Sequence, residues 1–469
     1  MKPNLKQLSQ YIARQVESEG YPGVAVCIRG PEGLLFSEGF GHRSKKKETL
    51  VDGDTVFGIA SLSKSFTALA CCMLQAEGKM SLDDPITKYF PDLHIPGLPD
   101  EAVTVKLLGL HRAGLPPMEP LEWSIAMNSV ERDTDMHRYL ISTAPNKMDK
   151  IEQIVEYISN CPYPSLGTPG EYMSYSNEGY ALLSYVVDQA SGMTLESFLD
   201  ERIFMPLGMS RSILDVDCLL ARERIGDDNI TSLFSTDEEG NLTEDDDWSV
   251  LPPYRGCAMV KSTANDLSKY YQMLSQNGVF DGRRIVPQEA VDLLVGCEYP
   301  LRKEPYYCQG LRKYFIGKRV ACDHGGELHG VSAYGGFLDG GYSAVVLCNG
   351  SELDMELLQW ACYNYILRMP LETDHAWAIP SGSTFKHPEM IAGNYVAHEG
   401  KPAHCIIKIE NGQLLCEYQD EEKGIRFCHS TVFAIFNAKT GKRESTFRFH
   451  IKDGRAWGVN CGSRIFQRV

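Results

Sequence analysis

The sequence lacks several features that would place it in common classes of protein. No apolar run is long enough to span a bilayer, and residues 1–20 contain no apolar core of the kind that a secretory signal needs. Positive charge is in the minority, because 46 lysines and arginines face 62 acidic residues and leave a net charge of −16. That charge opposes binding to nucleic acid or to an anionic membrane surface. We therefore expect a cytoplasmic protein that has neither nucleic acid nor membrane as a partner.

Several enzyme and metal-site motifs are also missing. There is no Gly-x-Ser-x-Gly turn and no glycine-rich phosphate loop, which argues against the most common serine-hydrolase fold and against nucleotide enzymes. The 15 cysteines are odd in number and include no Cys-x-x-Cys pair, so we expect reduced thiols. His398, Glu399 and His404 do not have zinc-site spacing, and the acidic residues 236–248 lack the alternation of a calcium loop. We expect no metal and no cofactor.

The chain of 469 residues is too long for one ordinary hydrophobic core, so we expect more than one domain. Two apolar runs flank a turn at residues 30–33 (GPEG), a pattern typical of a β-hairpin. Glycine-rich turns alternate with short apolar segments again over residues 319–350. Helical patterns lie between these ends, for example at residues 178–189 and 263–275. This order predicts an α/β sandwich with an antiparallel sheet and a helical region.

The sequence changes character after residues 376–387, a stretch rich in proline, serine and glycine that is typical of a linker. Short strand-like runs follow, with Asn-Gly at 411–412 and Asp-Gly at 453–454 as strong hairpin signals. Strands at this close spacing predict a small antiparallel β-barrel or sandwich. We therefore expect a first domain over residues 1–375 and a β-barrel domain over residues 388–469.

A serine and a lysine three residues apart stand near the head of the apolar run 57–74 (FGIASLSKSFTALACCML). Residues i and i+3 of a helix share a face, so Lys64 can place its amine beside the hydroxyl of Ser61. A serine hydroxyl is a weak nucleophile until a base takes its proton, and burial would suit a lysine amine to that task. The simpler alternative is that Ser61 only caps the helix.

The same spacing occurs twice more, at Ser44/Lys47 and at Ser383/Lys386. Ser44 stands in a charged loop and Ser383 stands in the linker, so neither is expected to have a preorganised pocket. The spacing alone carries little information, and the context favours Ser61.

Two further polar motifs follow along the chain. Tyr175 and Asn177 precede a predicted helix, and a tyrosine can relay a proton while an asparagine amide can bind a substrate carbonyl. Taken alone, this segment is equally well described as a polar loop that caps the helix. The third motif is His324 followed by Gly325 and Gly326, in a region of predicted strands. Glycines at such a place let a substrate approach a strand edge closely.

These three motifs, in this order, resemble the serine hydrolases that include class C β-lactamases, D-alanyl-D-alanine carboxypeptidases, D-aminopeptidases and related esterases. The Ser-x-x-Lys motif is shared with penicillin-binding proteins. The sequence between the motifs resembles that family too, at residues 104–116, 166–209 and 261–274. The resemblance therefore covers nearly all of residues 15–350. It implies a β-lactamase-like or penicillin-binding-protein-like sandwich, and the C-terminal strands resemble a lipocalin-like barrel.

The resemblance also implies a role for each motif residue. Ser61 would form the acyl-enzyme, Lys64 and Tyr175 would share proton transfer, and Asn177 would orient the substrate amide. The oxyanion hole would consist of the backbone N–H groups of Ser61 and of Glu327.

His324 stands where many members of this family have the lysine of a Lys-Thr-Gly motif. A lysine there anchors a substrate carboxylate, and a histidine does so less reliably, so penicillins are not the expected substrates. Gly326 and Glu327 follow on the same predicted strand, and an acidic Glu327 side chain would favour an amine-bearing substrate. The alternative is that only the backbone N–H of Glu327 matters, because adjacent side chains of a strand face opposite ways.

The expected function is therefore hydrolysis of an amide, peptide or ester bond through a Ser61 acyl-enzyme, with a small molecule or short peptide as substrate. An aminopeptidase or amidase activity on small aminoacyl substrates ranks first. An esterase, an acyltransferase or a binding protein that has lost catalysis are the alternatives. The barrel resemblance makes a homo-oligomer possible, and we expect residues 117–164 to form a lid or pocket wall.

Overall fold

The computed structural model describes residues 4–130, 134–226, 229–236, 241–298, 305–351, 353–376, 379 and 384–469. Ser383, the serine of the third Ser-x-x-Lys copy, therefore lies outside the described residues, as does part of the acidic stretch 236–248. Among the described residues, no helix combines the length and the apolar character needed to cross a membrane.

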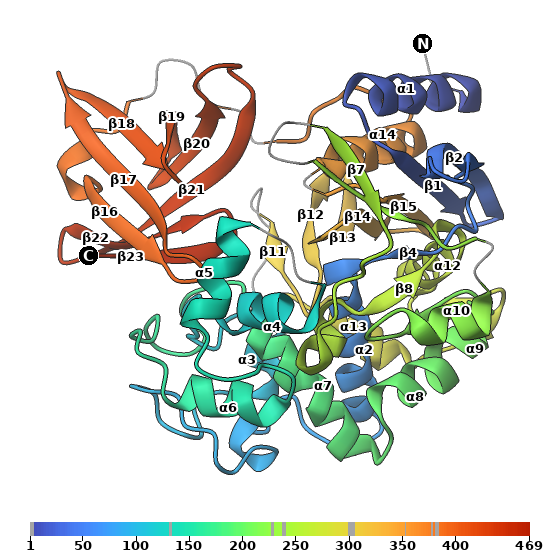
Figure 1. Cartoon of the computed structure of the whole chain (residues 1–469), viewed down its shortest axis with the longest axis horizontal. Helices are drawn as coiled ribbons and strands as arrows, with labels where there is room; N and C mark the ends of the chain where they lie inside the picture. Colours follow the sequence, from blue (N-terminus) through green and yellow to red (C-terminus); the bar gives the residue numbers. More distant parts are fainter. Residues whose placement is uncertain are drawn as a thin grey trace. The chain divides into compact units, whose positions relative to one another are not determined.

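The chain divides into two compact units (Figure 1). The first unit comprises Met1–Asp84, Asn128–Val130 and Tyr180–His375, and the second comprises Pro85–Met127, Glu131–Gly179 and Ala376–Val469. The C-terminal segment thus belongs to the same unit as much of the region from residue 85 to residue 179. The predicted domain limits at residues 375 and 388 stay a prediction.

An eight-stranded antiparallel sheet forms the centre of the first unit, in the order β11-β12-β13-β14-β15-β1-β2-β3. Strands from both ends of this part of the chain meet in it, because β1 pairs with β2 on one side and with β15 on the other. The predicted antiparallel sheet is confirmed. Its strands are β1 (Gly23–Gly30), β2 (Gly33–Ser44), β3 (Thr49–Leu50), β11 (Tyr306–Tyr307), β12 (Arg312–Ile316), β13 (Arg319–Leu328), β14 (Val331–Leu338) and β15 (Tyr342–Cys348).

Helices cover this sheet. The central strands are almost wholly buried and apolar, as expected for strands that are covered on both faces. α12 (Ala264–Ser275) packs on β1, β14 and β15, while α14 (Met355–Leu367) packs on β14 and β15 and also contacts α1 (Leu5–Ser18) (Figure 1). Further helices of the chain are α2 (Ser63–Ala76), α7 (Asn177–Ser191), α8 (Leu195–Leu199), α9 (Met205–Leu207), α10 (Leu219–Ile225), α11 (Arg255–Ala258) and α13 (Gln288–Leu294).

Short strands complete the first unit. A small sheet has the order β4-β8-β5, and two pairs of strands are β6 with β7 and β9 with β10. Their bounds are β4 (Phe57–Gly58), β5 (Ile213–Leu214), β6 (Leu233–Thr236), β7 (Leu242–Asp245), β8 (Val260–Ser262), β9 (Val279–Phe280) and β10 (Arg283–Arg284). β4 leads directly to the segment that carries Ser61.

The second unit combines short helices with a closed eight-stranded antiparallel barrel. The barrel and the hairpin turns at 411–412 and 453–454 are confirmed, since each pair joins two barrel strands and has positive φ angles, as Asn-Gly and Asp-Gly turns require. The helices are α3 (Val105–Gly109), α4 (Pro120–Asn128), α5 (Asp135–Thr143) and α6 (Ile151–Ser159). The barrel strands are β16 (Gly393–Ala397), β17 (Ala403–Glu410), β18 (Gln413–Tyr418), β19 (Glu421–His429), β20 (Val432–Asn437), β21 (Arg443–Lys452), β22 (Arg455–Cys461) and β23 (Arg464–Arg468).

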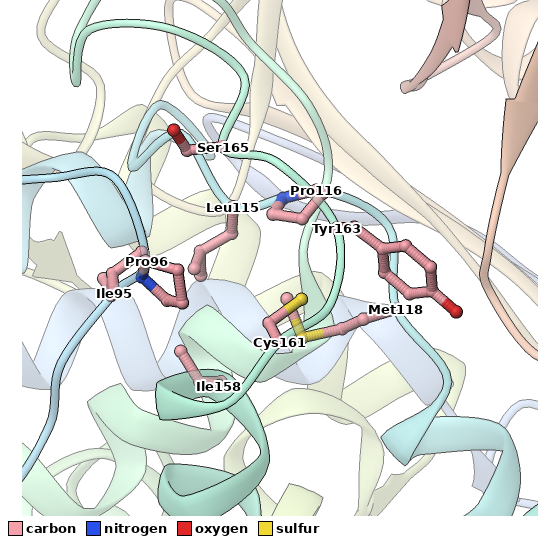
Figure 2. Close-up of a pocket in the computed structure, with 9 residues that line it drawn as sticks. All are labelled: Ile95, Pro96, Leu115, Pro116, Met118, Ile158, Cys161, Tyr163 and Ser165. Atoms are coloured by element: carbon pink, nitrogen blue, oxygen red, sulfur yellow. The ribbon is translucent and has the colours of Figure 1, made fainter. Parts of the chain in front are cut away.

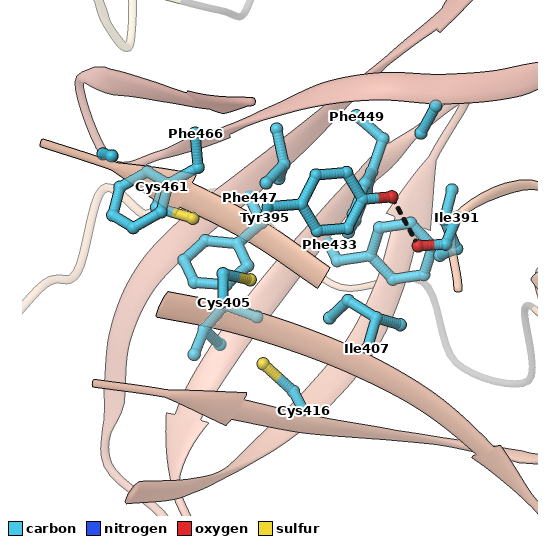
Figure 3. Packing of buried hydrophobic residues seen from close by; sticks show 14 residues of the cluster. Ile391, Tyr395, Cys405, Ile407, Cys416, Phe433, Phe447, Phe449, Cys461 and Phe466 are labelled. Atoms are coloured by element: carbon cyan, nitrogen blue, oxygen red, sulfur yellow. Dashed lines mark hydrogen bonds between the residues drawn. The ribbon is translucent and has the colours of Figure 1, made fainter. Parts of the chain in front are cut away.

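Aromatic rings and cysteines fill the barrel (Figure 3). The rings of Phe433 and Phe449 meet edge to face with centroids 5.5 Å apart, and Tyr395 lies 5.8 Å from Phe449. The Tyr395 hydroxyl donates a hydrogen bond of 2.6 Å to the backbone oxygen of Ile391, which satisfies the polar end of a fully buried ring. The barrel interior is therefore a packed core.

We expect Phe449→Ala to destabilise the barrel by about 3–5 kcal/mol, the usual cost of removing a buried aromatic side chain. Thermal unfolding measures the loss, and hydrogen exchange of the barrel amides shows where it falls. Phe315→Ala is the matched control, because that ring is 45% exposed on β12 and its removal should change stability by less than about 0.5 kcal/mol. Equal losses in both variants would contradict the packed core.

Candidate active site

Ser61 lies in the 3₁₀ turn η1 (Ala60–Leu62), which runs directly into α2. Lys64 occupies the first turn of α2, and its Nζ is 3.0 Å from Ser61 Oγ. Leu62, not Ser61, occupies the N-cap position of α2, and no side-chain capping bond is formed there. The alternative that Ser61 only caps the helix is therefore excluded, and the predicted pairing of hydroxyl and amine is present.

The backbone just before Ser61 is in an unusual conformation. Ala60 has a φ of 44°, in the left-handed region that residues other than glycine rarely adopt. Such conformations cost about 1–3 kcal/mol and persist only where the surroundings hold them. Ala60 is fully buried against Trp248 and Val331, while Ser61 itself is partly exposed. The strained turn thus presents the serine hydroxyl from a buried support.

The side chain of Lys64 is fully buried, and its amine also contacts Cys257 of α11. Its Nζ lies 2.9 Å from Cys257 Sγ and 3.3 Å from the backbone oxygen of Cys257. Arg255 anchors α11, because its guanidinium binds Glu196 at 2.8 Å and also pairs with Asp188. The two carboxylates raise the pKa of Arg255, even though burial opposes this. These ion pairs of Arg255 therefore hold α11, and with it Cys257, in place beside Lys64.

The histidine-glycine-glycine motif lies on β13, beside the serine turn. A Cβ atom added to Gly326 would lie 2.6 Å from the backbone oxygen of Ile59 and 3.0 Å from the nitrogen of Ser61, so only glycine allows this close approach. The structure thus brings Ser61, Lys64 and Gly326 together within the first unit. Glu327, the next residue, has an exposed side chain, and strand alternation turns it to the face opposite that of Gly326.

His324 is buried on the same strand and has partners for both ring nitrogens. Its Nε2 lies 2.7 Å from the hydroxyl of Tyr307 on β11, and its Nδ1 contacts the backbone oxygen of Gly325. Tyr307 was not predicted, since nothing in its local sequence links it to the motif. His324 is thus oriented by neighbouring groups of the sheet.

Tyr175 and Asn177 belong to the second unit, where they end the loop before α7 and begin that helix. Both side chains are buried. The Tyr175 ring packs on the ring of His111 with centroids 4.1 Å apart, and His111 Nδ1 accepts a hydrogen bond of 3.0 Å from the nitrogen of Ser176. His111 itself has a positive φ of 55°. It stands in the stretch 104–116 that carries part of the family resemblance, so that stretch could have identified it.

The Ser-x-x-Lys copy formed by Ser44 and Lys47 has a structural role. Ser44 Oγ donates a hydrogen bond of 2.6 Å to Glu244 Oε1, and the backbone nitrogen of Lys47 donates to Ser44 Oγ at 3.1 Å. The hydroxyl therefore stabilises a loop, and the Lys47 side chain is exposed. This outcome agrees with the expectation that Ser44 lacks a preorganised pocket.

A shallow apolar hollow lies in the second unit (Figure 2), and part of its lining comes from the connection between α6 and α7 that also carries Tyr175. None of the predicted site residues lines it. None of the residues that line it in the described part of the chain carries a charge, although the hydroxyl of Tyr163 donates a hydrogen bond to the carboxylate of Glu119. Its lining residues are Ile95, Pro96, Leu115, Pro116, Met118, Ile158, Cys161, Tyr163 and Ser165.

Comparison with known proteins agrees with the motifs. The family model described as Beta-lactamase matches residues 8–360. A penicillin-binding protein of Bacillus subtilis (strain 168) is 26% identical over 283 residues, which are 59% of this chain and 57% of that protein. The chain therefore matches less than two thirds of the length of this relative.

Two solved structures share the fold. The octameric penicillin-binding protein homologue from Pyrococcus abyssi has a TM-score of 0.67 and 22% identity, with 99% of each chain covered. The D-amino acid amidase from Ochrobactrum anthropi SV3, solved with L-phenylalanine amide, has a TM-score of 0.59 and 22% identity, with 78% of this chain and 97% of that chain covered. The predicted sandwich with a C-terminal barrel is confirmed.

We expect Gly326→Ala to slow the reaction of Ser61 with a fluorophosphonate probe by at least roughly tenfold, because the added methyl group meets the backbone of the serine turn. Gly325→Ala is the matched control, since the atoms nearest to a Cβ there belong to the Tyr334 ring, at 3.2 Å, and to the backbone oxygen of Ala333, at 4.0 Å, and not to the serine turn. Labelling rates measured on folded protein compare the two. Equal rates would mean that β13 does not constrain the serine turn.

Proposed function

Because the chain belongs to the β-lactamase family, we propose that it is a serine hydrolase that cleaves amide bonds through an acyl-enzyme on Ser61. One observation carries this proposal. The buried amine of Lys64 lies 3.0 Å from Ser61 Oγ, in the geometry that a base needs in order to take the hydroxyl proton.

The proposed reaction has two stages. Ser61 Oγ attacks the carbonyl carbon of the substrate while its proton passes to the neutral amine of Lys64. Tyr175 shares this proton transfer and delivers a proton to the leaving nitrogen, so the amine product departs and an ester to Ser61 remains. A water molecule then attacks the ester, its proton returns through the same groups, and the carboxylic acid is released. Asn177 orients the substrate amide.

The oxyanion that forms during both attacks needs two hydrogen-bond donors. We assign this role to the backbone N–H groups of Ser61 and Glu327. The close approach of Gly326 to the nitrogen of Ser61 supports the assignment, because it brings β13 against the serine turn. Backbone donors of this kind cost no reorganisation when negative charge develops.

Small aminoacyl amides are the proposed substrate class. His324 binds Tyr307 and a backbone oxygen, which leaves it poorly suited to replace a lysine that anchors a free carboxylate. The fold likeness to a D-amino acid amidase points to the same class of substrate. The intact pair of Ser61 and Lys64 disfavours a binding protein that has lost catalysis. We also propose that the chain self-associates, as the Pyrococcus abyssi homologue is octameric.

We expect Ser61→Ala to abolish labelling by a fluorophosphonate and hydrolysis of aminoacyl amides, with a comparable loss in Lys64→Ala. Tyr175→Phe should cost roughly 10²- to 10⁴-fold in turnover, the range of general acid–base catalysis, and less if water replaces the phenol. Ser44→Ala is the matched control, because it removes the serine of another Ser-x-x-Lys copy. Residual turnover above about a tenth in Ser61→Ala would disprove the assignment of the nucleophile.

Glu327→Gln tests whether charge selects the substrate. Its exposed side chain lies on the face opposite that of Gly326, so we expect the substitution to change KM equally for amine-bearing amides and for neutral esters. A selective rise in KM of roughly tenfold for the amine-bearing substrates, about 1.4 kcal/mol, would instead show that the carboxylate binds an ammonium group. Steady-state kinetics on both substrate types distinguish these outcomes.

A further inference from the structure

The loop that carries Tyr175 and Asn177 is bonded to the turn between β22 and β23 of the barrel. The nitrogen of Tyr175 donates a hydrogen bond of 2.8 Å to the backbone oxygen of Ser463, and the nitrogen of Ile465 donates one of 3.1 Å to Ser174 Oγ. These bonds lie within the second unit and use the backbone of the barrel turn. They anchor the loop without regard to the side chains of Tyr175 and Asn177.

A second set of contacts reaches those two side chains directly. The guanidinium carbon of Arg464 lies 4.6 Å from the centroid of the Tyr175 ring, a distance typical of a cation–π contact. Arg464 also binds both carboxylate oxygens of Glu399, with Nε to Oε2 at 2.5 Å and Nη2 to Oε1 at 2.6 Å. Such two-point pairing holds the guanidinium plane in one orientation.

Glu399 in turn contacts Asn177. Its Oε1 accepts a hydrogen bond of 3.3 Å from Asn177 Nδ2. A carboxylate can only accept hydrogen bonds, so it selects the orientation of the amide in which the NH₂ group faces Glu399. The carbonyl end of the Asn177 amide is thereby turned the other way.

Other carboxyl groups of the second unit lie near the pair of Arg464 and Glu399. Burial and the nearby Glu399 carboxylate raise the pKa of Glu122 to about 7, whereas Arg464 lowers it. Burial lowers the pKa of Arg464, but Glu399 and, to a smaller extent, Tyr175 and Glu178 raise it above its usual value. Arg464 is therefore the cation that offsets three neighbouring carboxyl groups.

We infer that Glu399 and Arg464, both contributed by the barrel, are positioning residues for the reaction: Glu399 orients the amide of Asn177, and Arg464 holds Glu399 and the ring of Tyr175 in place. This inference rests on the proposed function. On that function the barrel contributes to the positioning of Tyr175 and Asn177 within the second unit, although neither Glu399 nor Arg464 is itself required to touch the substrate.

The test measures the second-order rate of Ser61 labelling by a fluorophosphonate, together with kcat and KM for D-phenylalanine p-nitroanilide. We expect Glu399→Ala and Arg464→Met to lower the labelling rate and kcat by roughly tenfold to a hundredfold, the usual loss when a hydrogen bond to a charged group is removed. KM should change less than kcat, because positioning acts on the transition state. Arg426→Met is the matched control, since Arg426 lies 4.6 Å from the Phe436 ring in the same barrel, and it should leave both rates unchanged.

A double-mutant cycle separates positioning from a general loss of structure. If Glu399 acts through Asn177, adding Glu399→Ala to Asn177→Ala should lower the labelling rate little further, whereas a purely structural role would make the two losses multiply. Multiplied losses would overturn the inference. Where a single variant fails to fold, the paired variant Glu399→Gln/Arg464→Met removes both charges together, and wild-type rates in that folded protein would also overturn it.

The same experiment distinguishes the inference from the proposed function. If the unsubstituted protein is not labelled at Ser61, the proposed function fails and the inference fails with it. If Ser61 is labelled and the Glu399 and Arg464 variants react at the unsubstituted rate, only the inference is overturned.

Discussion

The buried amine of Lys64 is the constraint on which the rest of the first unit depends. An amine without water needs polar neighbours, and it has them in Ser61 Oγ and in both the sulfur and the backbone oxygen of Cys257. Those neighbours must themselves be held in place, which explains the ion pairs of Arg255 that fix α11. Ala60, in its left-handed conformation, directly precedes Ser61 and helps to set the direction of the chain at which the Ser61 hydroxyl meets the Lys64 amine.

In the second unit, the barrel contacts a motif that lies far from it in the sequence, Tyr175 and Asn177. Its interior is filled with aromatic side chains, so it has the character of a rigid support and not of a ligand-binding cavity. The part of the barrel that contacts this motif is the turn between β22 and β23, together with Glu399, which follows β16. There the barrel meets the loop that ends at Asn177 through backbone bonds and through the pair of Arg464 and Glu399. A rigid scaffold that fixes a polar loop is a common way to preorganise a site.

Much of the fold could be predicted from local signals. The hairpins at 411–412 and 453–454 follow from the backbone angles that Asn-Gly and Asp-Gly favour, and α12 begins where Thr263 caps it. The serine site was harder, because the Ser-x-x-Lys spacing occurs three times and only the apolar helix distinguishes Ser61. The contacts of Glu399 and Arg464 could not be predicted, since each meets Asn177 or Tyr175 across more than 200 residues of chain. Tyr307 lies much closer to His324 in the chain, but no local pattern links the two residues.

By itself, the sequence determined the elements and the chemistry available to them: an apolar helix that carries a serine and a lysine on one face, a glycine-rich strand, and a set of short strands separated by hairpin turns. These properties are local, because they depend on side-chain period and on turn conformation. The tertiary structure alone decided which residues surround that chemistry. Strand pairing places Gly326 where a methyl group would strike the serine turn, and packing of the β22–β23 hairpin against the loop before α7 brings Arg464 to the ring of Tyr175. Such contacts arise from packing between segments far apart in the chain, which no local pattern encodes.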